Sequence, residues 1–114
     1  MLLCTASVFS QKSLYSVEKT VCTWDEDIND FTNCEYARTS VRFLFNKDFT
    51  VLKTTGDIEI TFYLGKGKVN GELLSFESVT HDYQNCTVYV DSRSNTVKFL
   101  FTENDVIVLV TYML

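Results

Sequence analysis

The densest group of oxygen-bearing side chains lies in a short acidic run near the start of the chain. Asp25, Asp27 and Asn29 stand at alternating positions, as the first three ligands do in a calcium-binding loop. The second half of that motif differs, because Asp30 replaces its turn glycine and Tyr36 replaces its bidentate glutamate. Calcium binding by these first three residues is therefore one hypothesis, and a solvated acidic loop anchored by its aromatic residues is the preferred one.

Three cysteines lie beyond residue 10, and in an exported protein an even number of them should pair. A Cys22–Cys34 bond would staple the long loop between them and stabilise the fold by about 3 kcal/mol, by lowering the entropy of the unfolded chain. A Cys34–Cys86 bond is the alternative, since sequence does not fix the connectivity. A metal site is disfavoured, because these cysteines and His81 have no C-x-x-C spacing.

His81 is the only histidine, and it precedes Asp82. A catalytic arrangement with Cys34 or Cys86 can therefore be drawn, but only on residue type. The chain has no G-x-S-x-G, no glycine-rich phosphate loop and no H-E-x-x-H motif. We therefore predict that the protein is not an enzyme.

Composition indicates a folded domain without affinity for nucleic acid. The 114 residues are 46% hydrophobic and 22% charged, with a net charge of −5. A negative chain without a basic cluster lacks the charge needed to bind a phosphate backbone, and anionic lipid surfaces repel it. No apolar run approaches the roughly 20 residues of a membrane-spanning helix. We expect neither a nucleic-acid partner nor a membrane span.

The first ten residues have the character of a truncated signal peptide. They are mostly apolar, and Val8 and Ser10 occupy positions −3 and −1 if cleavage leaves Gln11 first. The basic start of a signal peptide is missing, so we expect the natural start to lie upstream. A first β-strand is the alternative. The predicted division is a leader remnant, 1–10, and one all-β domain, 11–114, that is secreted or periplasmic.

Beyond the leader, β-branched and aromatic runs are separated by turn residues at spacings of about 8 to 12. Val41, Phe43 and Phe45 alternate with other residues, and the segment 58–64 shows the same period of two, which is typical of half-buried strands. Strands are expected at 13–22, 38–45, 49–54, 57–64, 67–70, 72–80, 86–91, 96–101 and 106–113.

The connections between these runs are mostly of hairpin length. They predict an antiparallel up-and-down meander of about eight strands, closed or nearly closed into a small barrel, with a two-layer β-sandwich as the alternative. The dipeptide Asn70-Gly71 predicts a tight type I′ turn. The segment 23–36 is expected to be the longest irregular stretch.

The final run, 106–114, is apolar on both faces, so we expect it to be covered on both sides. Such a strand could close the barrel against the N-terminal segment, pack under the long loop, or form a homo-oligomer interface. Left exposed, it would be a template for aggregation.

Several short motifs resemble small exported proteins of Bacteroidota. They are the leader end Ser7 to Gln11, the run Trp24 to Asp27, Phe31, Cys34, and the strand end Phe43 to Asn46. The resemblance covers most of the chain, and it implies export and β structure without any known activity.

The chain also resembles lipocalin-like domains, which share a tryptophan near the first strand and an up-and-down meander. Cys22-Thr23-Trp24 stands where lipocalins have G-x-W, and the strands are short, which argues against a roomy cavity.

The function expected from these observations is a non-enzymatic exported binding or interaction module of the cell envelope. Its partner would be a protein or a small apolar ligand. The alternatives are a small lipocalin-like carrier of an apolar molecule, which a fully side-chain-filled interior would exclude, and a calcium-stabilised structural domain.

Overall fold

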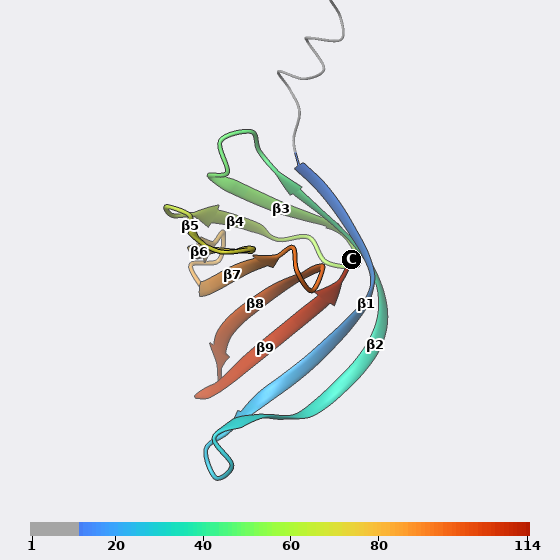
Figure 1. Cartoon of the computed structure of the whole chain (residues 1–114), viewed down its shortest axis with the longest axis vertical. Helices are drawn as coiled ribbons and strands as arrows, with labels where there is room; N and C mark the ends of the chain where they lie inside the picture. The colour runs from blue at the N-terminus through green and yellow to red at the C-terminus, as the bar shows by residue number, and fades with distance from the viewer. Residues whose placement is uncertain (1–11) are drawn as a thin grey trace, which may run out of the picture.

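The computed structural model describes residues 12–114, which form nine β-strands and no helix (Figure 1). The strands are β1 (Lys12–Asp25), β2 (Asp30–Phe45), β3 (Val51–Gly56), β4 (Thr61–Leu64), β5 (Lys68–Asn70), β6 (Leu73–Thr80), β7 (Asn85–Asp91), β8 (Thr96–Glu103) and β9 (Val106–Met113). The predicted all-β class is confirmed, whereas the predicted leader lies outside the described residues. Within the described range, no helix has the length and apolar character needed to cross a membrane.

Eight of these strands close a ring of backbone hydrogen bonds, and all of them pair antiparallel. Strands β1 to β4 pair in order, β4 then pairs with β6, and β6 to β9 continue in order until β9 pairs with β1. β5 lies outside the ring and pairs only with β6. The predicted meander is confirmed, and the alternative of two separate layers is wrong because all nine strands belong to one sheet.

Inward-facing side chains fill much of the ring. Val41, Phe43 and Phe45 of β2 are at most 1% exposed, which confirms the alternation expected there. The Phe43 ring packs against Phe99 of β8 and Tyr112 of β9, with ring centroids 5.9 and 5.1 Å apart. Strands that are distant in sequence therefore share one aromatic core.

β1 and β2 continue beyond the rest of the ring as one long hairpin, which ends at the bottom of Figure 1. The expectation of an irregular segment over 23–36 is wrong. Trp24 and Phe31 are direct cross-strand partners, with ring centroids 5.1 Å apart. Asn29 and Asn33 adopt φ of 55° and 51°, which asparagine tolerates better than most residues. Cross-strand packing and tolerant turn residues thus outweigh the polar composition.

β9 closes the ring against β1, the first of the roles expected for the C-terminal run. Val108 and Tyr112 are buried, but Val106 and Ile107 are 41% and 40% exposed. The expectation that both faces are covered is therefore wrong at the start of the strand, which adjoins the exposed β8–β9 turn. Both edges of β9 are hydrogen-bonded within the chain, so assembly through this strand, which stays a prediction, would have to use its outer face.

The β5–β6 hairpin forms, but its turn is one residue later than predicted. Asn70 pairs with Leu73, so Gly71 and Glu72 are the turn residues. Gly71 has a φ of 64° and open space around it, whereas Asn70 does not have a positive φ. A one-residue slip would exchange the faces of β6, and the observed register lets Leu74 pack against the core. The type I′ turn centred on Asn70-Gly71 is therefore wrong.

Candidate functional site

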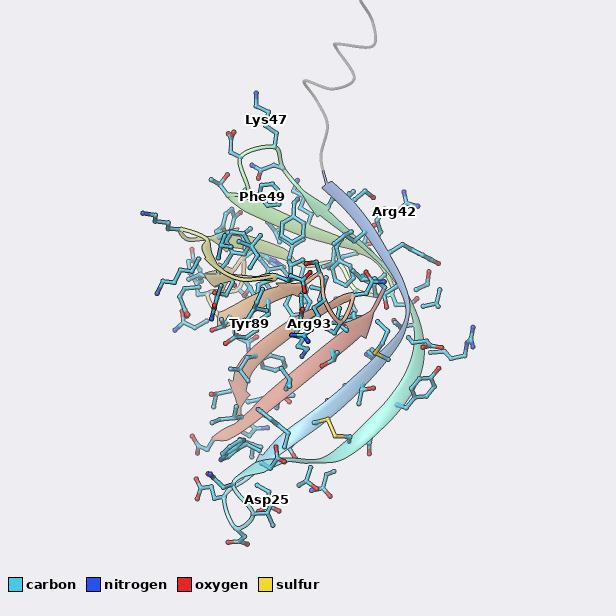
Figure 2. All side chains as sticks on the ribbon, viewed as in Figure 1. Asp25, Arg42, Lys47, Phe49, Tyr89 and Arg93 are labelled. Carbon is cyan, nitrogen blue, oxygen red and sulfur yellow. A yellow bond between two sulfur atoms is a disulfide. The ribbon has the colours of Figure 1, made fainter. Side chains whose placement is uncertain are left out.

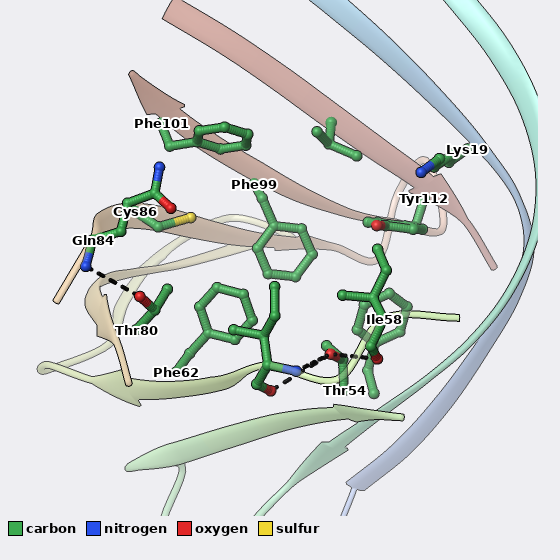
Figure 3. A pocket seen from close by; sticks show the side chains of 13 residues that line it. Lys19, Thr54, Ile58, Phe62, Thr80, Gln84, Cys86, Phe99, Phe101 and Tyr112 are labelled. Carbon is green, nitrogen blue, oxygen red and sulfur yellow. Dashed lines mark hydrogen bonds between the residues drawn. The ribbon is translucent and has the colours of Figure 1, made fainter. Parts of the chain in front are cut away.

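A pocket of about 190 Å³ opens inside the ring, beside the β3–β4 and β6–β7 connections. Its walls are mainly apolar and aromatic, and they come from strands on opposite sides of the ring (Figure 3). The principal wall residues are Phe43, Ile60, Phe62, Phe99, Phe101 and Val110. Concave apolar surface with few polar groups is what small-molecule sites in proteins usually offer.

Thr54 forms one side of the pocket mouth by holding the β3–β4 connection in place. Its hydroxyl donates a hydrogen bond to the Ile58 carbonyl and accepts one from the Ile60 amide, each at 3.0 Å. β4 consequently begins at Thr61, and the strand predicted over 57–64 is shorter at its start. Ile58 and Ile60 instead pack against the core at the pocket.

Thr80 organises the opposite side of the mouth. Its buried hydroxyl accepts hydrogen bonds from the amides of Asp82 and Gln84, at 3.3 and 3.1 Å, and so shapes the β6–β7 turn. Gln84 and Cys86, on the far side of that turn, then line the pocket (Figure 3). Side-chain hydrogen bonds to the backbone therefore form both connections at the mouth.

Lys19 is the only basic residue among those lining the pocket. It faces inward because the β1–β2 register shifts between Ser16 and Glu18. Strict alternation after the buried Ser16 would have turned Glu18 inward and Lys19 outward. The Ser16 hydroxyl supports this irregularity by bonding to the carbonyls of Glu18 and Met113, at 2.8 and 2.6 Å.

Tyr112 of β9 is the direct cross-strand partner of Lys19, so the two side chains share one face of the sheet. Tyr112 is only 4% exposed, and burial raises the pKa of its hydroxyl to about 12. The phenol is therefore a hydrogen-bond donor at neutral pH. Figure 3 shows the Lys19 amine and the Tyr112 hydroxyl on the same side of the pocket.

Cys86 contributes a thiol to the pocket wall and is not in a disulfide. It is 6% exposed, and burial raises the pKa of the thiol to about 11. Since the thiolate is the reactive form, this side chain acts at neutral pH as a small apolar group.

These raised pKa values predict a loss of stability at alkaline pH. The ordinary values are 9.0 for the Cys86 thiol and 10.0 for the Tyr112 hydroxyl, so the unfolded chain releases both protons at lower pH than the folded one. The stability that they contribute is complete below about pH 9 and is lost as the pH rises towards about 12. We expect Tyr112→Phe to lose less stability over this range than the unchanged protein. Urea unfolding at several pH values gives the change in unfolding free energy with pH for the two proteins. An equal change in both would contradict the raised pKa of Tyr112.

Cys22 and Cys34 form a disulfide between β1 and β2, drawn in yellow in Figure 2. The first-choice pairing from the sequence is therefore confirmed, and the Cys34–Cys86 alternative is wrong. The bond lies beside the second register shift of the hairpin, between Val21 and Thr23.

Asp25, Asp27 and Asn29 surround the hairpin turn, at the end of the molecule where Figure 2 labels Asp25. The Asp25 carboxylate already accepts a hydrogen bond from the Asp27 amide at 2.9 Å, which caps the turn. In the described part of the chain, no three His, Cys, Asp or Glu side chains are grouped as metal ligands. Calcium binding stays a prediction, and melting curves with calcium and with chelator test it.

His81 lies in the β6–β7 turn, where its Nδ1 accepts a hydrogen bond from the Thr61 amide at 3.2 Å. Its Nε2 is 3.5 Å from an Asp82 carboxylate oxygen. Among the described residues, His81 forms no hydrogen bond with a cysteine or serine, and Cys34 is already oxidised. The structure does not assemble the Cys-His-Asp arrangement that residue types alone allowed.

The sequence did not identify the pocket or its polar pair. Lys19 and Tyr112 are 93 positions apart and meet only through the β1–β9 register. The one available signal was the apolar C-terminal run, which had to be covered by another part of the chain. No protein-family model, curated protein or solved structure matches this chain.

Proposed function

We propose that the protein is a non-enzymatic binding module that holds a small apolar molecule in the pocket of its ring. The observation that carries the proposal is the cavity of about 190 Å³, walled by side chains such as Phe62, Phe99 and Phe101. Burial of apolar ligand surface against such walls is favourable in water. This proposal combines two expectations from the sequence, the non-enzymatic binding module and the small carrier of an apolar molecule.

The size of the cavity limits the ligand. Pockets for drug-sized molecules typically measure about 300–1,000 Å³, whereas an apolar cavity of about 150 Å³ accepts benzene. At about 190 Å³, this pocket fits one aromatic ring or a short branched chain. The rest of the interior is filled by residues such as Phe45 and Leu52, which leaves no room for a long acyl chain.

The proposed location is outside the cytoplasm, either secreted or in the periplasmic space of the cell envelope. The Cys22–Cys34 disulfide supports this, because such bonds persist mainly in oxidising compartments. The sequence features of residues 1–10 are the second support.

A second candidate is an interaction module that binds an extended peptide along β2. Residues 41–45 of β2 pair with β3, but in the described structure no strand pairs with the outer edge of residues 30–39. Peptides can add to such an edge through backbone hydrogen bonds. Glu35, Arg38 and the irregularity at Asn33 are features that usually keep edges unpaired, so we favour the pocket.

Toluene tests the proposed binding role, because it is apolar, uncharged and of the right size. A ligand that binds only the folded state at 100 times its dissociation constant adds about 2.7 kcal/mol to the free energy of unfolding. We expect toluene to raise the melting temperature of the unchanged protein, whereas anthracene, which is too large, leaves it unchanged.

Two tryptophan substitutions locate the effect. Ile60→Trp fills the pocket and should abolish the response to toluene, whereas Val69→Trp, at a site that is 76% exposed on β5, should retain it. An absent response in the unchanged protein, or an equal response in Ile60→Trp, would contradict the proposed function.

A further inference from the structure

Two hydrogen-bond donors on neighbouring strands face a mainly apolar pocket without a partner among residues 12–114. In the described part of the chain, no carboxylate lies within salt-bridge distance of the Lys19 amine. Within residues 12–114 the Tyr112 hydroxyl makes no hydrogen bond, and burial is the cause of its raised pKa. Among the described residues, no buried side-chain nitrogen or oxygen lacks a hydrogen-bond partner, so both of these atoms keep contact with solvent at the pocket. A ligand acceptor that replaces this solvent would find two donors on one wall of an apolar cavity.

The chemistry of this pair selects a particular kind of ligand group. Lys19 supplies a positive charge and hydrogen-bond donors, and Tyr112 supplies one further donor while it stays protonated. The Lys19 ammonium can only donate, and the Tyr112 hydroxyl can donate as well, so the pair best matches a ligand group with two acceptor sites. A carboxylate has two oxygens and one negative charge, so it can accept from both side chains and match the single cation.

Resting on the binding function above, we propose that the ligand is a small aromatic or branched monocarboxylate. Its carboxylate lies between Lys19 and Tyr112, and its apolar part lies against Phe62, Phe99 and Phe101. A hydrocarbon of the same shape would fill the cavity but offer no acceptor, and a neutral amide would offer an acceptor without the negative charge that matches Lys19.

The free energy of binding depends on how well the ligand carboxylate pairs with Lys19 and Tyr112. Taking a carboxylate out of water is costly unless it finds a cation and hydrogen-bond donors. Lys19 is half-buried and therefore stays partly hydrated before binding, which reduces the cost of holding its charge at the pocket. Charge-assisted hydrogen bonds of this kind are roughly twice as strong as neutral ones.

Calorimetric titration with phenylacetate and phenylacetamide tests the inference on the unchanged protein. The two probes share the ring and the methylene, and at neutral pH only the acid is charged. We expect the acid to bind at least about tenfold more tightly than the amide, because hydrogen bonds to charged groups are worth more than neutral ones.

Three variants assign the preference to the residues. Lys19→Met should remove the preference for phenylacetate without lowering the affinity for phenylacetamide. Tyr112→Phe should lower the affinity for phenylacetate several-fold. Tyr112→Phe keeps the ring that packs on Phe43. Lys53→Met, at an exposed position of β3, is the matched control and should behave like the unchanged protein.

The outcomes separate the two proposals. Two outcomes would overturn the carboxylate inference and leave the apolar binding function standing. Either phenylacetate and phenylacetamide bind equally, or toluene binds while neither of them does. If phenylacetate, phenylacetamide and toluene all fail to bind, both proposals are wrong. Retention of the acid preference in Lys19→Met would also overturn the assignment.

Discussion

Replacing Phe43 with alanine should lower the free energy of unfolding by about 3–5 kcal/mol. Phe43 is fully buried, and its ring contacts Phe99 and Tyr112 from the other side of the ring of strands. The substitution removes apolar contact and leaves a cavity that β2, paired on both edges at this point, has little freedom to fill. Because small domains have a total stability of about 5–15 kcal/mol, the variant should be near the limit of folding.

Tyr63→Ala is the matched control for this prediction. Tyr63 is also an aromatic residue in a strand, but it is 55% exposed on β4. Its loss should cost less than about 1 kcal/mol, the typical range of a cross-strand pair. Urea unfolding followed by circular dichroism gives both values, and equal destabilisation of the two variants would contradict the assigned core.

Removing the disulfide with Cys22→Ser and Cys34→Ser together should lower the free energy of unfolding by about 2–3 kcal/mol. The bond restricts the unfolded chain over a separation of 12 residues. It also joins β1 and β2 beside the part of their hairpin that lies beyond the last β1–β9 pair, at Thr23. The hairpin beyond the bond should therefore open more readily as well.

Two measurements check this prediction. Thermal or urea unfolding of the double variant gives the global effect, and reduction of the unchanged protein should reproduce it. Amide hydrogens around Trp24 and Phe31 should exchange faster in the double variant than in the protein that keeps the disulfide, and this increase should exceed that in the core of β2. If exchange at these sites is unchanged, the hairpin is held by strand pairing alone and the role given to the disulfide is wrong.

The period of two along the chain was sufficient to predict most strands. Alternation of Val41, Phe43 and Phe45 is a local signal, and short turn segments made antiparallel neighbours the expected arrangement. The hairpin tip was missed because its acidic residues have low strand propensity, while the features that hold it, the Trp24–Phe31 contact and the disulfide, act across strands.

The candidate site could not be predicted because its position depends on small irregularities. A register shift after Ser16 turns Lys19 inward, and the hydroxyls of Thr54 and Thr80 fold the two connections that flank the pocket mouth. The β4–β6 pairing that closes the ring likewise skips one strand. Composition and periodicity report none of these, since each depends on tertiary contacts that a local pattern does not encode.

The most direct test of the account is a methyl NMR titration of the intact protein with toluene. The predicted result is that resonances of Ile58, Ile60 and Val110 shift with saturation, since these methyl groups line the pocket. Those of Val69 and Val79, which are exposed on β5 and β6, should stay in place. Shifts confined to the exposed valines, or no saturable shift at all, would contradict a ligand site inside the ring.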